Sequence, residues 1–203
     1  MQEPMTASRY PMYADTPPVR RPDDPVYRFR PSPSRYRTGS RSNVLLPRDL
    51  DMWGLSDVDP GLSITHFGPS TRRDLDSVLV PIAGGPNSDA AVSVAADLAR
   101  YWHASLLLLT VVPPSRDRST WMEADARLHN YADDVDTVPV EVGVRTRDDI
   151  VTAITECARD HDLVVIGKSE RSFFRRLFRG TIPEQLAERT DTPLFVVEYE
   201  THG

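Results

Sequence analysis

The apolar residues of this chain gather in five short runs, all of which follow residue 75. They occupy positions 78–82, 106–112, 138–144, 163–166 and 194–197. Apolar runs of this length indicate strands that are buried on both faces of a sheet. Between the runs, apolar residues recur every three or four positions, which predicts amphipathic helices over 88–102, 120–132, 148–159 and 181–189.

Strand and helix patterns therefore alternate along residues 74–203. Such alternation predicts a doubly wound α/β domain, with a five-stranded parallel sheet and helices on both of its faces. In sheets of this kind, ligands bind beyond the carboxyl ends of the strands, where the strand order reverses. The loops after the first, second and fourth runs are therefore the places to look for a binding site.

Residues 1–73 have a different composition. They hold 11 of the 18 prolines, and Pro, Arg, Ser, Tyr and Asp dominate the first fifty positions. A segment that buries little apolar surface cannot offset the entropy lost on ordering, so residues 1–50 are predicted to form a disordered tail. Residues 51–73 are predicted to hold one short strand or docking segment, built from Trp53, Leu55, Leu62, Ile64 and Phe67.

Charge and cysteine content exclude several classes of protein. Residues 74–203 carry a net charge of −9 and residues 1–73 one of +3, so the part that folds is too acidic for a uniformly basic nucleic-acid binder. Cys157 is the only cysteine, which excludes a disulfide-stapled scaffold. No apolar run is long enough to cross a bilayer, and the first thirty residues lack the apolar stretch of a signal peptide. We therefore expect a cytoplasmic protein.

The loop after the fourth run carries the clearest sign of a ligand site. It begins at Gly167 and ends at Gly180-Thr181, which opens a predicted helix. Glycines let an anion approach the backbone, and the free N–H groups of a helix start bind phosphate oxygens. The loop's cations are Lys168, Arg171, Arg175, Arg176 and Arg179. Thr181 and Glu184 also form a capping box, as do Thr120 and Glu123, and a capping box needs no ligand.

These motifs resemble the universal stress protein family over residues 75–198. Its nucleotide-binding members carry G-x2-G-x9-G-[ST] at this loop and a first strand that ends V-P-[IV]-D-G-S. The resemblance implies an adenine nucleotide site, with ATP and Mg²⁺ as the bound species and at most slow ATP hydrolysis. By position, the nucleotide-binding residues are Pro81, Ile82, Ala83, Val111, Gly167, Lys168, Arg171, Gly180, Thr181 and Ile182.

The chain departs from the family pattern at two positions. Ala83 stands where the binding members have Asp, an acceptor for the polar edge of adenosine, and Glu170 stands where they have the second glycine. The variant looks like the subgroup fused to amino-acid permeases. Two functions therefore stay open. One is a stress-responsive module that binds a nucleotide, and the other is an adaptor that docks a transporter or another partner through residues 173–179 or the tail.

The resemblance also implies a homodimer in which the last strand, Leu194 to Val197, pairs across a two-fold axis. An apolar edge strand needs a cover, which favours the same arrangement. Aromatic residues alternate with arginines in the tail, a pattern found in single-stranded nucleic-acid binding but more commonly in a solvated low-complexity segment, so nucleic acid is not the expected partner.

Three further motifs have a structural as well as a functional interpretation. The loop from Gly84 to Ser88 has a weak likeness to a pyrophosphate loop, but it also fits a tight turn capped by Asn87. Cys157 falls on the predicted core face of its helix. The five histidines show no metal-ligand spacing, and no catalytic group or metal site is predicted.

Overall fold

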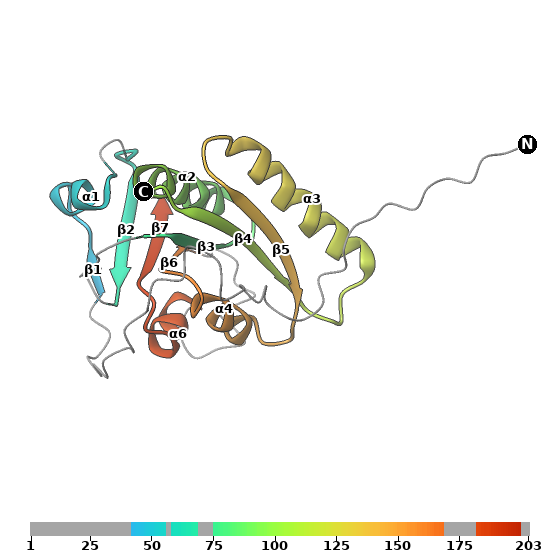
Figure 1. Ribbon diagram of the computed structural model, residues 1–203. Helices are drawn as coiled ribbons and strands as arrows, with labels where there is room; N and C mark the ends of the chain where they lie inside the picture. Colours follow the sequence, from blue (N-terminus) through green and yellow to red (C-terminus); the bar gives the residue numbers. More distant parts are fainter. Residues whose placement is uncertain (1–41, 56–57, 69–74, 169–181, 200–203) are drawn as a thin grey trace, which may run out of the picture. The chain divides into compact units, whose positions relative to one another are not determined.

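The computed structural model describes residues 42–55, 58–68, 75–168 and 182–199, all within the unit formed by residues 38–203 (Figure 1). The elements are, in chain order, β1 (Ser42–Val44), α1 (Pro47–Trp53), β2 (Leu62–Phe67), β3 (Ser77–Pro81), α2 (Pro86–Trp102), β4 (Ser105–Val112), α3 (Arg118–Asp134), β5 (Val140–Thr146), α4 (Ile150–Ala158), β6 (Leu163–Gly167), α6 (Ile182–Arg189) and β7 (Leu194–Tyr199). Residues 1–41, most of the tail predicted to be disordered, lie outside the described ranges.

The described strands form one sheet in the order β1-β2-β7-β6-β3-β4-β5. Strands β3 to β7 are the five strands predicted from the sequence, and every pair among them is parallel. The prediction of a five-stranded sheet is wrong in number, because β1 and β2 add two antiparallel strands. The strand order reverses at β3, which lies between β4 and β6. The carboxyl ends of these three strands therefore meet at one edge of the sheet.

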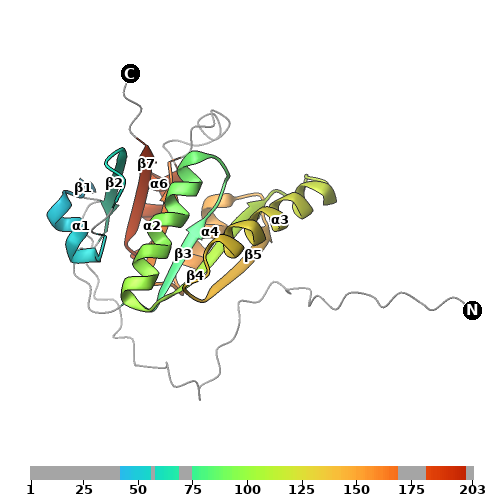
Figure 2. The ribbon, with the colours of Figure 1, turned by 90° about the horizontal axis from the view of Figure 1, so that it is seen from above.

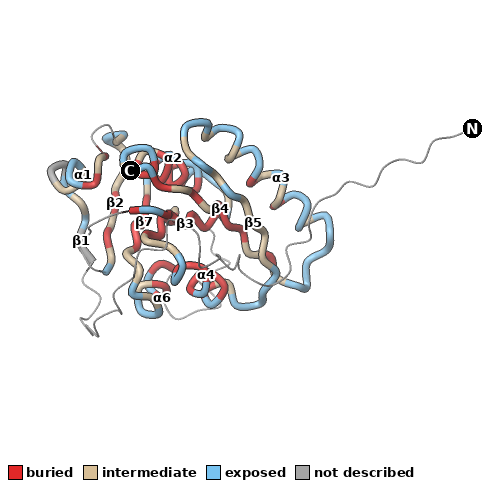
Figure 3. The backbone as a smooth tube through the Cα atoms, viewed as in Figure 1, coloured by how far each residue is buried: buried red, intermediate tan, exposed pale blue. Residues whose placement is uncertain are grey.

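Helices cover both faces of the sheet, as the doubly wound prediction requires. Figures 1 and 2 show α2 and α3 on one face and α4 and α6 on the other. Alternate side chains of β3 supply both layers: Val78 and Val80 pack toward α2, whereas Leu79 packs with residues of α4 and α6. Figure 3 shows the buried residues concentrated on the central strands and on the sheet-facing sides of the helices. The two apolar layers hold the parallel strands rigidly beneath the loops of interest.

The segment before β3 is part of the sheet. Residues 42–50, predicted to be disordered, form β1 and the start of α1, so that prediction is wrong for them. The short strand predicted within 51–73 is confirmed as β2. β2 pairs antiparallel with β7 along its whole length, from Leu62 opposite Tyr199 to Phe67 opposite Leu194. Its side chains contribute to the core, because Ile64 is only 2% exposed.

β7 is consequently an internal strand. β2 occupies the side of β7 that a second molecule would need, and β1 pairs with the far side of β2. The predicted homodimer, in which Leu194 to Val197 pairs across a two-fold axis, is not met in this arrangement, because β2 already takes that place in the ladder. The apolar edge of β7 does have a cover, as expected, and β2 of the same chain provides it.

Aspartates begin two of the helices. Asp117 is the N-cap of α3, and its carboxylate accepts hydrogen bonds from the Thr120 N–H at 3.0 Å and the Thr120 hydroxyl at 2.8 Å. These bonds lower the pKa of Asp117. The capping box expected at Thr120 is therefore wrong, because the aspartate before it takes the capping position. Asp149 caps α4 through Thr152 in the same way.

Truncation of β2 tests whether the N-terminal segment belongs to the fold. Ile64→Ala removes a buried side chain from the layer beneath α2, so we expect it to lower the free energy of unfolding by about 2–5 kcal/mol. Val44→Ala is the matched control, because Val44 is 58% exposed. Urea titration of full-length protein, followed by circular dichroism, measures both. Equal stability of Ile64→Ala and the wild type would contradict the packing described for β2.

Candidate functional site

The carboxyl ends of β3 and β4 bring together four of the predicted nucleotide-binding residues, Pro81, Ile82, Ala83 and Val111. The backbone N–H of Ile82 donates to the Leu109 carbonyl at 2.8 Å, and the buried Thr110 hydroxyl donates to the Ile82 carbonyl at 3.0 Å. These bonds fix the exit of β3 against β4. Pro81 and Ile82 are buried, so the surface at this point comes from the exposed Ala83 and the half-buried Val111.

Two glycines form the turn from β3 into α2. Gly84 and Gly85 have φ values of +87° and +96°, which side chains rarely adopt, so the turn depends on glycine at both positions. Gly85 is the N-cap of α2, and its carbonyl accepts from the N–H of Ser88 at 2.8 Å. The Ser88 side chain in turn accepts from the Gly84 N–H at 3.1 Å. The turn is therefore closed by its own hydrogen bonds.

Asn87 is buried in the first turn of α2 and joins it to two strands. Its side-chain amide donates to the Lys168 carbonyl at 2.8 Å, and its side-chain oxygen accepts from the Tyr199 N–H at 3.0 Å. The expectation that Asn87 caps the turn is wrong, since Gly85 holds the N-cap position. Asn87 instead fixes the ends of β6 and β7 against the start of α2.

Gly167, the last residue of β6, allows this close approach. A Cβ at position 167 would lie 2.2 Å from the carbonyl oxygen of Asn87 and 2.8 Å from the nitrogen of Ser88. Both atoms belong to the backbone and cannot rotate away. Gly167 therefore has a packing role that is independent of any ligand, beside the phosphate contact that the sequence predicts.

Lys168 lies at the start of the predicted phosphate loop and is held by β7. Its backbone N–H donates to the Val197 carbonyl at 2.8 Å, and its ammonium group contacts both carboxylate oxygens of Glu198, at 2.5 and 2.6 Å. The two side chains are 47% and 39% exposed. The cation expected to meet phosphate thus has an intramolecular acidic partner, which the local sequence did not reveal.

The remaining predicted residues fall in two groups. Ile182 is buried at the first residue of α6. Arg171, Gly180 and Thr181 lie outside the described residues, as do Glu170 and the aromatic, basic segment 173–179. The described part of the site therefore comprises the β3 and β4 ends, the glycine turn and the Gly167-Lys168 end of β6.

Helix α3 supplies neighbours of the turn that the sequence analysis missed. A Cβ on Gly84 would lie 3.1 Å from a guanidinium nitrogen of Arg127, so this cation borders the turn. The Tyr131 hydroxyl donates to the Asp89 carboxylate on α2. Desolvation, and then this hydrogen bond, raise the pKa of Tyr131 to about 12. No local motif could identify these residues, because their partners lie on another helix.

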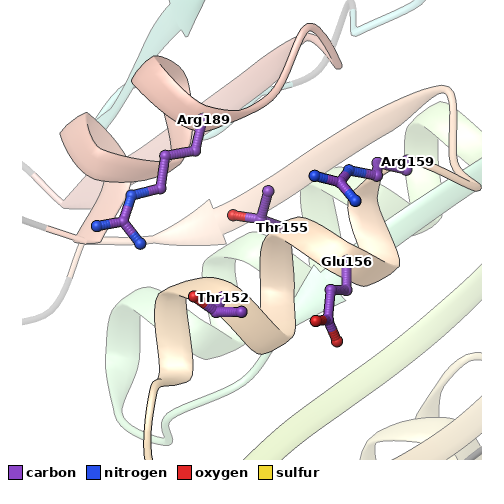
Figure 4. Close-up of a pocket in the computed structure, with 5 residues that line it drawn as sticks. All are labelled: Thr152, Thr155, Glu156, Arg159 and Arg189. Atoms are coloured by element: carbon purple, nitrogen blue, oxygen red, sulfur yellow. The ribbon is translucent and has the colours of Figure 1, made fainter.

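A pocket of about 340 Å³ lies along α4 and α6, on the face of the sheet opposite α2 and α3 (Figure 4). It is lined by Thr152, Thr155, Glu156, Arg159 and Arg189. The hydroxyls of both threonines are engaged, with Asp149 at 2.7 Å and the Val151 carbonyl at 2.8 Å. Figure 4 shows the two guanidinium groups in different parts of the pocket rather than converging on one point.

The described residues show neither a metal site nor a membrane-spanning helix. No cluster of three or more His, Cys, Asp or Glu side chains in them is arranged to hold a metal ion. None of the helices described is both long and apolar enough to cross a bilayer. Cys157 lies on the buried face of α4, as predicted, and this burial raises the pKa of its thiol.

Comparisons with known proteins agree with this architecture. A universal stress protein in complex with cAMP superposes with a TM-score of 0.51 at 23% identity, covering 63% of this chain and all (100%) of that one. A universal stress protein from Archaeoglobus fulgidus gives a TM-score of 0.52 at 15% identity, covering 61% of this chain and 94% of its own. The structure of the A. fulgidus protein with dAMP gives 0.51 at 15% identity, covering 60% and 97%.

Sequence comparison gives the assignment. No curated protein matches the chain by sequence. Residues 75–198, which make up more than half of the chain and run from just before β3 to near the end of β7, match the family described as the Universal stress protein family. The chain therefore belongs to the universal stress protein family.

Proposed function

We propose that this chain is a regulatory, cytoplasmic binding module that takes an adenine nucleotide at the carboxyl edge of β3, β4 and β6. The observation that carries the proposal is the reversal of strand order at β3. Because of this reversal, the Gly84-Gly85 turn and the Gly167-Lys168 end of β6 lie at the same edge of the sheet. Ligands of doubly wound sheets bind at such a point. Two proteins of the same fold were solved with cAMP and with dAMP, which supports the choice of ligand.

The residues at this edge divide into a surface for the base and groups for the phosphates. Ala83 and Val111 offer a small, partly apolar surface for the base. We assign the phosphates to Lys168 and, from the sequence motif, to Arg171, Gly180 and Thr181. Mg²⁺ would accompany ATP and neutralise phosphate charge, while the chain's own cations orient it.

Two features of the site predict weak binding. Ala83 offers no acceptor to the polar edge of adenosine, and an unpaired polar group in a bound ligand costs about 1–3 kcal/mol. Lys168 is already paired with Glu198, so phosphate must compete for it. An exposed ion pair contributes only about 0–1 kcal/mol, so a phosphate group can replace Glu198 as the partner of Lys168 at little cost. The same two features favour the second candidate function, an adaptor that docks a transporter or another protein without nucleotide.

Calorimetric titration of the full-length protein with ATP and Mg²⁺, cAMP and dAMP separates the two functions. We expect at least one nucleotide to bind with a Kd below about 1 mM, which corresponds to about −4 kcal/mol. Thr181→Ala and Arg171→Ala should weaken binding, whereas Arg37→Ala, in the tail, should leave it unchanged. Absence of binding at millimolar nucleotide would leave the adaptor as the surviving function.

Restoring an acceptor at the end of β3 should strengthen nucleotide binding. Ala83→Asp places a carboxylate on the exposed surface next to the glycine turn, and a hydrogen bond to a charged group there should improve affinity about tenfold. Ser93→Asp adds the same charge at an exposed position within α2 and should change nothing. An Ala83→Asp protein with wild-type affinity would show that the base does not lie against this residue.

Release of Lys168 tests the phosphate side of the site. Glu198→Gln removes the carboxylate charge that holds the ammonium group, so ATP should bind about threefold more tightly while uncharged adenosine binds as before. Glu156→Gln, a half-exposed carboxylate on α4, serves as the control. Equal improvement for ATP and adenosine would show that Lys168 does not face the phosphates.

A further inference from the structure

β5 forms the end of the described sheet opposite β1, with β6, β3 and β4 between it and β7 (Figure 1). Its one neighbour among the described strands is β4. β1, at the other end, is only three residues long, whereas β5 has seven. An open strand of this length offers a row of N–H and C=O groups to another strand. β5 is therefore the long open edge of the described sheet.

The hydrogen bonds to β4 show which backbone groups of β5 face the open edge. The Leu106 N–H donates to the Pro139 carbonyl at 2.8 Å, and the Arg147 N–H donates to the Val112 carbonyl at 3.1 Å. On the side of β5 these groups belong to odd-numbered positions, and successive residues of a strand point their backbone groups in opposite directions. The N–H and C=O groups of positions 140, 142, 144 and 146 therefore point away from β4.

The sequence of β5 is complementary to its own reverse. Residues 140–146 read Val-Glu-Val-Gly-Val-Arg-Thr, with Gly143 at the centre. An antiparallel copy centred on Gly143 places Glu141 opposite Arg145, and each valine opposite a valine or the threonine. Opposite charges directly across a strand pair stabilise it by about 0.2–1 kcal/mol, whereas like charges destabilise it. The side chains of β5 therefore favour pairing with a second β5.

The backbone favours the same alignment. It pairs position 142 with 144 and position 140 with 146, all of which face the open edge, so each pair can exchange two hydrogen bonds. A shift of one residue would pair groups that face the edge with groups that face β4. A shift of two residues would leave one of the two charges opposite Gly143. The alignment centred on Gly143 thus satisfies the backbone and the charges together.

Glu141 and Arg145 are available for this pairing. None of the ion pairs among the described residues includes either side chain. They cannot meet each other within one chain, because four residues of a strand span about 13 Å. Glu141 is exposed and Arg145 is half-buried. Both charges can therefore be paired by a second chain without breaking a bond in the first.

Helix α3 adds apolar surface beside the open edge. Tyr131 faces α2 through its bond to Asp89, and Met122, nine residues earlier, lies on the opposite side of the helix. Met122 is 56% exposed and Trp121 40% exposed. α3 packs on β4 and β5, so this side is turned toward the edge. A two-fold axis through the β5 pair keeps both copies of α3 on one face of the joined sheet.

We propose that β5 is an interaction surface for a second copy of this chain, which pairs antiparallel with it about Gly143. Glu141 of each copy then faces Arg145 of the other, and the sheet continues from one molecule into the next. β7 takes no part, because β2 occupies its outer side. This proposal does not depend on nucleotide binding.

Charge reversal tests the pairing in the full-length protein. Glu141→Arg and Arg145→Glu each place like charges opposite one another, so each should raise the dissociation constant of the dimer about tenfold. An equimolar mixture of the two variants should dimerise like the wild type, since every pair across the axis is again oppositely charged. Sedimentation velocity at micromolar concentration measures all three. Glu188→Arg, an equal change of charge at an exposed position of α6, is the control and should change nothing.

A cysteine at the centre of β5 tests the register. Gly143→Cys places two thiols opposite each other, at positions whose Cα atoms are about 4.5 Å apart, within the range for a disulfide. The side chain has room, since a Cβ there would lie 3.9 Å from methyl carbons of Leu107 and Leu109. Mild oxidation should give a covalent dimer on a non-reducing gel. Glu141→Cys is the matched control and should not cross-link, because its two copies lie about 13 Å apart along the strands. The native Cys157 is buried.

Three outcomes would overturn the proposal. One is a wild-type protein that stays monomeric at every concentration reached. Another is a dimer that persists unchanged in both charge-reversal variants, which would place the interface elsewhere. The third is a folded Gly143→Cys protein that cross-links no faster than Glu141→Cys. Circular dichroism establishes that each variant is folded, and if a charge-reversal variant is not, the two cysteine variants decide.

Discussion

The approach of α2 to the end of β6 is the contact on which the carboxyl edge depends. Gly167 has no Cβ, and for that reason the first turn of α2 can rest directly on the last residue of β6. The buried amide of Asn87 then satisfies one backbone group from each of the two strand ends. Buried polar groups are costly when unpaired, so this arrangement leaves little freedom at the edge. The positions of the glycine turn and of Lys168 both follow from it.

The parallel part of the fold was predictable because its strands are buried on both faces. Such strands appear in the sequence as short apolar runs, whatever their partners are. β2 alternates Leu62 and Ile64 with Ser63 and Thr65, a weaker pattern that indicated a strand but not its place. Its partner, β7, lies at the other end of the chain. The sequence pattern could not reveal that a long-range antiparallel pair would close the sheet.

The parts of the candidate site that could be predicted are those where a glycine or a short motif indicates a turn or a close backbone approach. Gly167 and the turn after β3 fall where the sequence placed them, although the packing role of Gly167 became evident only from Asn87. Glu198 and Arg127 could not be found in this way, because they reach the site from β7 and from α3. The charges that surround a site come from segments far apart in the sequence. A local motif therefore reveals the cation Lys168 but not its partner Glu198.

β7 connects the N-terminal strand β2 to the candidate site. One side of the strand pairs antiparallel with β2 along its whole length. At its carboxyl end the same strand holds the site, since the Val197 carbonyl accepts from Lys168 and the Tyr199 N–H donates to Asn87. A strand that supplies its ladder bonds to a neighbour cannot move without shifting the groups at its end. The pairing of β2 with β7 therefore bears on the candidate site through the backbone of β7, which carries both the Val197 carbonyl and the Glu198 carboxylate that hold Lys168.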